Sequence, residues 1–231
     1  MPVVVSRTYG QLCPIARALD VVGERWTLLV VRELLLGPKR FKDLMARLPA
    51  MGTNRLSDRL KSLERDGVIA KRILPPPGEA HVYVLTDAGE RLRPAVLCLA
   101  TWGLERPVDE RMDPRTARAE LLALVRCGLA PPELTRGAHE TYEFQIGEER
   151  FHVLVNDGDA TPRSGSAPFA PDVTIVCDIP TLLMLDSGQI TPARAKRERL
   201  ARIEGPAAAV RRAFEIFSRK HVTDTLRVVP G

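Results

Sequence analysis

The chain has 231 residues, a length that suits one large domain or two small ones. Residues 1–103 hold 16 Lys and Arg against 10 Asp and Glu, whereas residues 104–231 hold 18 against 19, so the excess of positive charge lies in the first part. This excess favours a polyanionic partner for the first part, although a basic solvated surface has the same composition. The opening residues lack a signal-peptide pattern and no apolar run reaches ~18 residues, so we expect a cytoplasmic protein without a membrane partner.

The four cysteines and four histidines are scattered along the sequence. No CxxC pair or other ligand spacing occurs, so we expect no metal site, no disulfide framework and no cofactor. The sequence also lacks a nucleophile elbow, a phosphate-binding loop and paired catalytic carboxylates. These observations indicate a protein that is not an enzyme.

Apolar residues at helical spacing predict four helices at the start of the chain. Cys13 is the predicted N-cap of the first, and Pro14 takes its first position, where a proline is tolerated. Gly37 and Pro38 end the second helix, and Gly67 follows the fourth. The predicted helices lie at Pro14–Val22, Trp26–Leu34, Phe41–Leu48 and from Thr53 to about Arg65.

A hairpin and a further helix follow. Val68–Leu74 and His81–Leu85 are strand-like and are joined by the turn Pro75–Gly78. Thr86 is the predicted N-cap of one long helix that reaches Trp102. Helix, helix, short helix, turn, helix, hairpin, helix is the order of a winged helix-turn-helix, in which one helix enters the major groove of DNA and the hairpin reaches the neighbouring backbone.

The fourth helix has the chemistry that base recognition needs. Leu56, Leu60 and Leu63 form its apolar stripe, so a polar face points the other way. Asn, Arg, Lys, Ser and Thr on that face can bond base edges or phosphates, although many amphipathic helices have a solvated polar face. The interpretation depends on the position of this helix after a tight turn and before a basic hairpin.

Five segments in the same order resemble the HxlR-type winged-helix regulators of bacteria: Cys13–Leu19, Gly23–Leu34, Arg40–Leu44, Leu56–Gly67 and Tyr83–Gly89. The resemblance covers residues 10–103 and implies a homodimer on a pseudo-palindromic operator, with dimer contacts from the first and last helices of the domain. It also implies that Arg40 contacts phosphate and that Arg72 and the Pro75–Gly78 tip form the wing. Arg59 is either a DNA contact or a member of a structural ion pair.

The candidate DNA-binding residues are therefore Arg40, Thr53, Asn54, Arg55, Ser57, Asp58, Lys61, Lys71, Arg72 and His81. Cys13 is a candidate redox residue, because N–H groups at a helix N-terminus stabilise a thiolate and some relatives sense oxidants with a cysteine at this point. The alternative role for Cys13 is a small capping or dimer-packing residue.

The second part of the chain predicts an α+β domain with an antiparallel sheet. We place the winged helix-turn-helix domain at residues 1–105, a Pro- and charge-rich linker at 106–114 and the second domain at 115–231. Asp157–Pro171 has the composition of a long surface loop or lid. The predicted helices lie at Arg115–Leu124, Thr181–Leu185, after Thr191-Pro192 and at Ala207–Phe217; the predicted strands are Tyr142–Ile146, Phe151–Val155 and Val173–Cys177.

Residues 140–217 resemble the sterol-carrier-protein type of lipid-binding domain, through Asp172–Ile175, Leu182-Leu183, Ser187-Gly188, Thr191-Pro192 and Arg202–Gly205. The chain departs from that pattern at Lys196–Arg199, where the family often has a small residue. The resemblance implies a pocket for a hydrophobic effector, and an alanine-rich helix over an apolar sheet favours a cavity. The candidate pocket residues are Phe144, Ile146, Phe151, Val153, Leu182, Val210 and Phe214.

The predicted function is therefore a homodimeric transcription regulator that binds double-stranded DNA and responds to a hydrophobic small molecule. The alternative is a lipid-binding or carrier-like protein whose basic domain is a scaffold and whose second half serves only dimerisation or stability.

Overall fold

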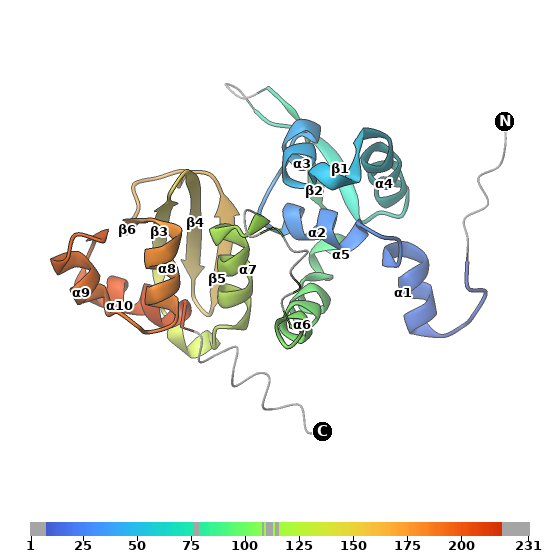
Figure 1. Cartoon of the computed structure of the whole chain (residues 1–231). Helices are drawn as coiled ribbons and strands as arrows, with labels where there is room; N and C mark the ends of the chain where they lie inside the picture. The colour runs from blue at the N-terminus through green and yellow to red at the C-terminus, as the bar shows by residue number, and fades with distance from the viewer. Residues whose placement is uncertain (1–7, 76–78, 108, 110–112, 114–115, 219–231) are drawn as a thin grey trace. The chain divides into compact units, whose positions relative to one another are not determined.

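The computed structural model describes residues 8–75, 79–107, 109, 113 and 116–218 (Figure 1). The chain divides into two compact units, residues 1–96 and residues 97–231, and this division falls inside helix α6 (Arg93–Leu104). Residues 76–78 of the predicted wing tip, Arg115 of the predicted helix and most of the predicted linker lie outside the described residues. None of the described helices is long and apolar enough to cross a membrane.

The first unit has the element order that the sequence predicts. Its helices are α1 (Pro14–Val22), α2 (Thr27–Leu35), α3 (Phe41–Arg47), α4 (Thr53–Arg65) and α5 (Asp87–Glu90), and its strands are β1 (Ile69–Ile73) and β2 (His81–Leu85). Cys13 is the N-cap residue of α1 and Pro14 begins that helix, as predicted. Leu56, Leu60 and Leu63 are almost fully buried, which confirms the apolar stripe of α4.

The two strands of the first unit form an antiparallel hairpin, and a third segment extends it. The backbone N–H of Lys39 donates to the carbonyl of Tyr83 at 3.1 Å, and the N–H of Tyr83 donates to the carbonyl of Lys39 at 2.8 Å. The buried Lys39 ammonium donates to the carbonyls of Leu36 and Gly37 at 3.2 and 3.1 Å. These bonds fix the hairpin to the end of α2.

The prediction of one long helix after Thr86 is wrong. Thr86 caps the short helix α5, accepting a hydrogen bond from the N–H of Gly89 at 3.2 Å, and α6 begins separately at Arg93. Pro94 explains the break, because a proline lacks the N–H of a continuous helix and its ring collides with the carbonyl four residues earlier. In the first turn of a new helix the same residue is tolerated.

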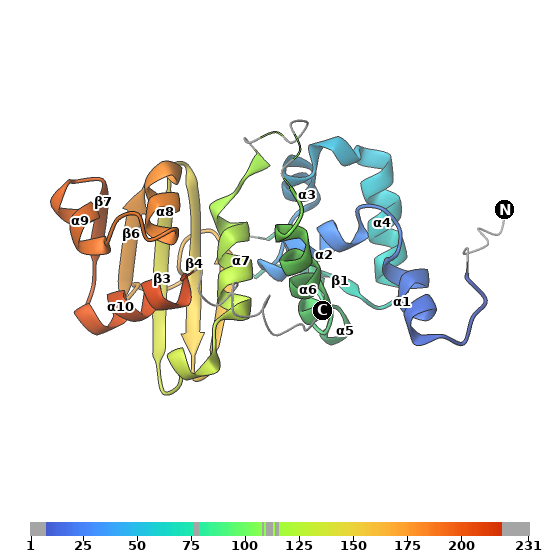
Figure 2. The same cartoon turned by 60° about the horizontal axis from the view of Figure 1, so that its bottom comes forward.

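The second unit is built on a five-stranded sheet with the strand order β5-β4-β3-β6-β7. Helices α7, α8 and α10 lie on one face of this sheet (Figures 1 and 2). The strands are β3 (His139–Ile146), β4 (Glu149–Asn156), β5 (Asp159–Ser164), β6 (Val173–Cys177) and β7 (Ala201–Glu204); the helices are α7 (Ala119–Leu129), α8 (Ile179–Asp186), α9 (Pro192–Arg197) and α10 (Ala207–Ile216).

The sheet is mixed, which corrects the prediction of an antiparallel sheet. Strand β6 pairs in parallel with β3, with Tyr142 opposite Val173, whereas the other neighbouring strands are antiparallel. The segment 165–172 carries the chain from β5 past β4 to the far side of β3. The carboxylate of Glu143 on β3 accepts a hydrogen bond from the N–H of Ala167, and the ring of His152 bonds the carbonyl of Gly165. At its end the N–H of Asp172 donates to the carbonyl of Thr141 at 2.8 Å, so β6 starts beside the beginning of β3 and runs in the same direction.

The predicted loop Asp157–Pro171 is also wrong, since most of its first half is the edge strand β5. Asp157 and Gly158 make a tight turn with positive φ angles of 36° and 95°, which returns the chain directly along β4. Pro162 sits opposite Val153 in this strand. An edge strand tolerates a proline because the missing N–H would face away from the sheet.

The core of the second unit lies between the helices and one face of the sheet. Phe144 and Phe151 stack across β3 and β4 with ring centroids 4.8 Å apart. The carboxylate of Glu149 accepts hydrogen bonds from the first two N–H groups of α7 at 3.2 and 3.3 Å. Arg126 of α7 and Asp186 of α8 form a buried ion pair through two hydrogen bonds of 3.0 Å, so the two helices are held together by charge as well as by packing.

Candidate DNA-binding surface and C-terminal cavities

Helix α4 presents its predicted polar residues to solvent. Gly52 precedes it with a φ of 77°, a conformation that glycine adopts without strain and that turns the chain sharply into the helix. The side chains opposite the buried leucines are exposed, except that of Ser57, which is half-buried; the exposed residues are Thr53, Asn54, Arg55, Asp58 and Lys61. The helix therefore offers donors and acceptors along one continuous face.

The basic residues of the hairpin differ in their partners. Lys71 donates to the carboxylate of Glu64 at 2.8 Å and lies 5.8 Å from the ring centroid of Tyr83. The hydrogen bond to Glu64 raises the pKa of Lys71 above its ordinary value. Arg72 and His81 are exposed on the two strands, and among the described residues Arg72 has no ion-pair partner. Of the two cations on β1, Arg72 is thus the one whose charge is not already compensated.

The two remaining arginines have structural contacts. Arg40 is the N-cap residue of α3, where its backbone N–H donates to the carboxylate of Asp43 at 2.9 Å, and its side chain is half-buried. Arg59 forms an ion pair with Glu24 at 3.3 Å, which is the structural alternative that the sequence left open for it. Arg59 therefore connects α4 to the segment between α1 and α2.

Two helices expose large apolar side chains. On and before α1, Leu12 and Ile15 are 96% and 70% exposed, and Leu99 and Trp102 of α6 are also exposed. Cys13 and Cys98, one on each of these segments, are exposed free thiols, whereas Cys127 and Cys177 are buried. Burial raises the pKa of the Cys177 thiol to about 11. The cysteines that reagents can reach are therefore those beside the exposed apolar residues.

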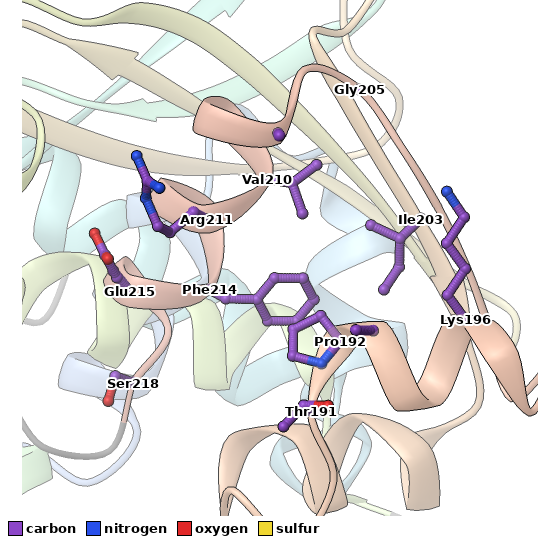
Figure 3. A pocket seen from close by; sticks show the side chains of 12 residues that line it. Thr191, Pro192, Lys196, Ile203, Gly205, Val210, Arg211, Phe214, Glu215 and Ser218 are labelled. Atoms are coloured by element: carbon purple, nitrogen blue, oxygen red, sulfur yellow. The ribbon is translucent and has the colours of Figure 1, made fainter.

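The second unit contains two neighbouring cavities. The outer cavity has a volume of about 630 Å³ and lies between α9, β7 and α10 (Figure 3). The inner cavity has a volume of about 320 Å³ and lies between α8, α10 and the core face of the sheet. Thr191, Pro192, Phe214 and Ser218 line both cavities, so the two are adjacent.

Of the seven predicted pocket residues, Phe144, Leu182, Val210 and Phe214 line a cavity. Ile146, Phe151 and Val153 are buried in the sheet and line neither of the two. The sequence reasoning missed Lys196, Ile203 and Arg211, which line the outer cavity. The one available signal was the Thr191-Pro192 start of α9, because a helix placed there brings Lys196 to the cavity edge.

The comparisons with known proteins match the N-terminal part of the chain. A model of the HxlR-like helix-turn-helix family matches residues 21–110. The uncharacterized HTH-type transcriptional regulator YvaP of Bacillus subtilis is 36% identical over 97 residues, which are 42% of this chain and 90% of YvaP. The HTH-type transcriptional regulator YodB of the same organism is 32% identical over 92 residues, 39% of this chain and 82% of YodB.

Two solved structures are similar to the same part of the chain. Reduced YodB is 30% identical and covers 43% of this chain and 100% of its own, with a TM-score of 0.37. The redox regulator HypR in its oxidized form is 29% identical and covers 42% of this chain and 100% of its own, with a TM-score of 0.39.

The helix order α1 to α4, the basic hairpin that follows and the polar outer face of α4 define a helix-turn-helix DNA-binding domain in the first hundred residues. The match to YvaP, which extends over nine-tenths of that protein's length, establishes the family to which the chain belongs. The chain belongs to the HxlR-like helix-turn-helix family and is a transcriptional regulator.

Proposed function

We propose that the chain acts in the bacterial cytoplasm as a homodimer on a pseudo-palindromic operator, and that an apolar small molecule bound in the second unit modulates this binding. The exposed polar face of α4 is the observation that carries the proposal. Asn54 and Arg55 would read base edges from its first turn, while Lys61, Arg40 and Arg72 would contact phosphates.

The exposed apolar residues support the homodimer. Leu12 just before α1 and Ile15 on it place apolar side chains in water, and Leu99 and Trp102 do so on α6. Large apolar side chains left in water favour an interaction site, and a symmetric dimer would cover the same residues on both copies. Leu12→Glu and Ile15→Glu should convert the dimer to a monomer in sedimentation velocity, whereas the exposed Lys42→Glu should not. A dimer that persists in both variants would place the interface elsewhere.

The test of base reading compares residues on the same helix. Asn54→Ala and Arg55→Ala should each weaken operator binding by about 1–3 kcal/mol and relax specificity locally. Arg65→Ala is the matched control, because Arg65 is exposed on the last turn of α4 and is bound to Asp66 and Ser62. An equal loss on operator and random DNA would show that α4 does not read bases.

The cavities support the effector and the sterol-carrier-like interpretation of the second unit. Their volumes lie in the range of small-molecule sites, and apolar side chains from the sheet and α10 line them. The alternative, a carrier with a scaffold domain, predicts no sequence preference. A salt-titrated gel shift separates them, since a regulator should bind its operator ~10³-fold or more above random DNA.

Cys13 carries a second candidate function, redox sensing. Its exposed thiol lies at the N-terminus of α1, and the similar protein HypR is described as a redox regulator. Diamide should lower operator affinity in the unchanged chain and in Cys98→Ser, which removes the other exposed thiol, but not in Cys13→Ser. Unchanged affinity of a chain whose Cys13 is shown to be oxidised would exclude this role.

A further inference from the structure

We infer that a basic segment of the second unit, residues 194–202, is a second DNA-contact site. It binds phosphates of the duplex outside the part that α4 occupies, whatever the base sequence there. The inference goes beyond the proposed function, which gives the second unit only an effector, and it rests on DNA binding by the first unit.

Positive charge is concentrated in this segment although the second part of the chain as a whole is balanced. Residues 194–204 hold five Lys and Arg against two Glu, whereas the remainder of residues 104–231 holds 13 against 17. A count over the whole second part therefore conceals the cluster. Four of its five cations are arginines, whose planar guanidinium group can form two parallel hydrogen bonds to one phosphate.

The cations surround the outer side of α9. Ala195 is the buried residue of this helix, so Arg194 and Lys196 lie on its two flanks and Arg197 lies opposite the buried side. All five cations of the segment are exposed. Figure 2 shows α9 beside β7, which is an edge strand of the sheet. The segment is therefore at a border of the second unit, where a partner as large as a duplex can reach it.

Two of the five cations have structural roles. Arg194 and Glu198 form an ion pair at 2.7 Å, and Arg202 and Glu204 form one at 3.6 Å on β7. Charged side chains on an edge strand prevent it from pairing with other chains. Protection of the edge thus accounts for Arg202, but not for the cations that lie outside the strand.

The other three cations, Lys196, Arg197 and Arg199, have no ion-pair partner among the described residues. Arg211 of α10, which lines the outer cavity together with Lys196 and Glu215, has none either, so the positive surface continues beyond the segment. Like charges held close together repel one another. The surface therefore favours a partner with several closely spaced negative charges, as the two backbones of a duplex supply.

Arg199 occupies a backbone position that favours glycine. It follows the last turn of α9 with a φ of 57°. Its N–H donates to the carbonyl of Lys196 at 3.2 Å, and the N–H of Leu200 donates to that of Ala195 at 2.9 Å. These are the two bonds of a Schellman motif, in which the residue with positive φ is usually glycine. No side-chain bond within the described residues offsets the strain, so a contact with a ligand would account for an arginine here.

Duplex DNA is the polyanion that the observations favour. The first unit belongs to a DNA-binding family, and because both units are parts of one chain, DNA bound by the first is presented to the second at a high effective concentration. A membrane-binding surface combines cations with several large apolar side chains. Between residues 192 and 202, all of which are described, Leu200 is the one large apolar side chain that is exposed.

The test measures how the full chain binds a random duplex of about 40 base pairs, by fluorescence anisotropy at several salt concentrations. Lys196→Ala/Arg197→Ala should lower the slope of log affinity against log salt by about two units per chain and weaken binding several-fold. Arg136→Ala/Arg150→Ala removes the same charge elsewhere on the second unit and should leave the slope unchanged. Equal effects of the two double variants would show that net charge alone acts, and would overturn the site.

Arg199→Gly separates the contact from the fold. Because glycine suits a positive φ, this variant should unfold at no lower urea concentration than the unchanged chain, yet lose about one unit of salt slope. The variants of the segment should weaken operator and random DNA equally, whereas Asn54→Ala should weaken the operator more. An unchanged slope in Arg199→Gly and in Lys196→Ala/Arg197→Ala would overturn the inference and leave base reading by α4 standing.

Vesicles of phosphatidylcholine mixed with phosphatidylglycerol test a membrane as the partner. We expect the unchanged chain and Lys196→Ala/Arg197→Ala to sediment equally little with them. A loss of vesicle binding in that variant, with unchanged DNA binding, would assign the segment to a lipid surface and overturn the DNA contact. A chain that binds neither random nor operator DNA would overturn this inference and the proposed operator binding together.

Discussion

The two units of the chain differ in where groups without a packing partner lie. In the first unit, Leu12 and Ile15 leave apolar side chains in water, and α4 turns a row of polar side chains outward above a fully buried stripe. In the second unit, Phe144 and Phe151 are buried, and the open space lies beneath the surface, beside α10. The first unit therefore carries its polar and apolar contact groups on its surface, whereas the second has open space in its interior.

The largest effect should come from the buried ion pair of the second unit. Arg126→Ala leaves the carboxylate of Asp186 buried without its main partner, and both side chains are less than 10% exposed. Loss of one member of such a pair costs about 3–5 kcal/mol, whereas Arg126→Met/Asp186→Leu should recover most of that stability. Hydrogen exchange should show faster opening in α7 and α8 and unchanged protection in α2 and α4. Equal loss of protection in both regions would mean that the units unfold as one body.

A smaller effect should separate the two cations of the hairpin. Arg72→Ala should reduce the slope of operator affinity against salt concentration by about one unit, because a phosphate contact is lost. Lys71→Ala should change the slope by less, since Glu64 already compensates that charge. Fluorescence anisotropy at several salt concentrations measures both slopes. The reverse ranking would show that the pair of Lys71 and Glu64 opens on DNA.

The smallest effects compare one helix cap in each unit. Thr86 accepts a hydrogen bond from Gly89 at the start of α5, and Asp178 accepts one from Thr181 at the start of α8. Replacing either residue by Ala should cost roughly 1 kcal/mol at neutral pH. Chemical denaturation of each variant, followed in the affected unit, measures the loss.

Only the cap of α8 should depend on pH. Hydrogen bonds from Thr181 hold the pKa of Asp178 below its ordinary value of 3.8. The stabilisation by Asp178 is therefore complete above that value and is lost as the pH falls through the lowered pKa. The difference between the unchanged chain and Asp178→Ala should shrink in acid, while that for Thr86→Ala should not. A pH-independent difference for Asp178 would exclude the charged cap.

The helices of the first unit were predictable because two signals agree there: the capping residues mark the same helix starts as the spacing of the apolar residues. Cys13-Pro14 and Gly52-Thr53 mark helix starts that the leucine spacing independently supports. The break between α5 and α6 was missed because the apolar stripe continues through it, although Pro94 was its signal. In the second unit, the edge strand β5 was missed because Pro162 is untypical of a strand. The parallel pairing of β3 with β6 was missed because no local sequence pattern indicates it. Lys196 and Arg211 belong to separate helices, so only the fold brings them to one cavity.

The parallel pairing of β3 and β6 has a consequence for the order of folding. Strands β3 and β4 are joined by a two-residue turn at Gly147, so their pairing closes a very short loop. Pairing Tyr142 with Val173 closes a loop of about thirty residues, and its entropic cost is correspondingly larger. We expect the β3–β4–β5 meander to form early and to leave the outer edge of β3 open. Strands β6 and β7 would then add to that edge, and the cavities would appear only in the last step, when α9 and α10 close over the sheet.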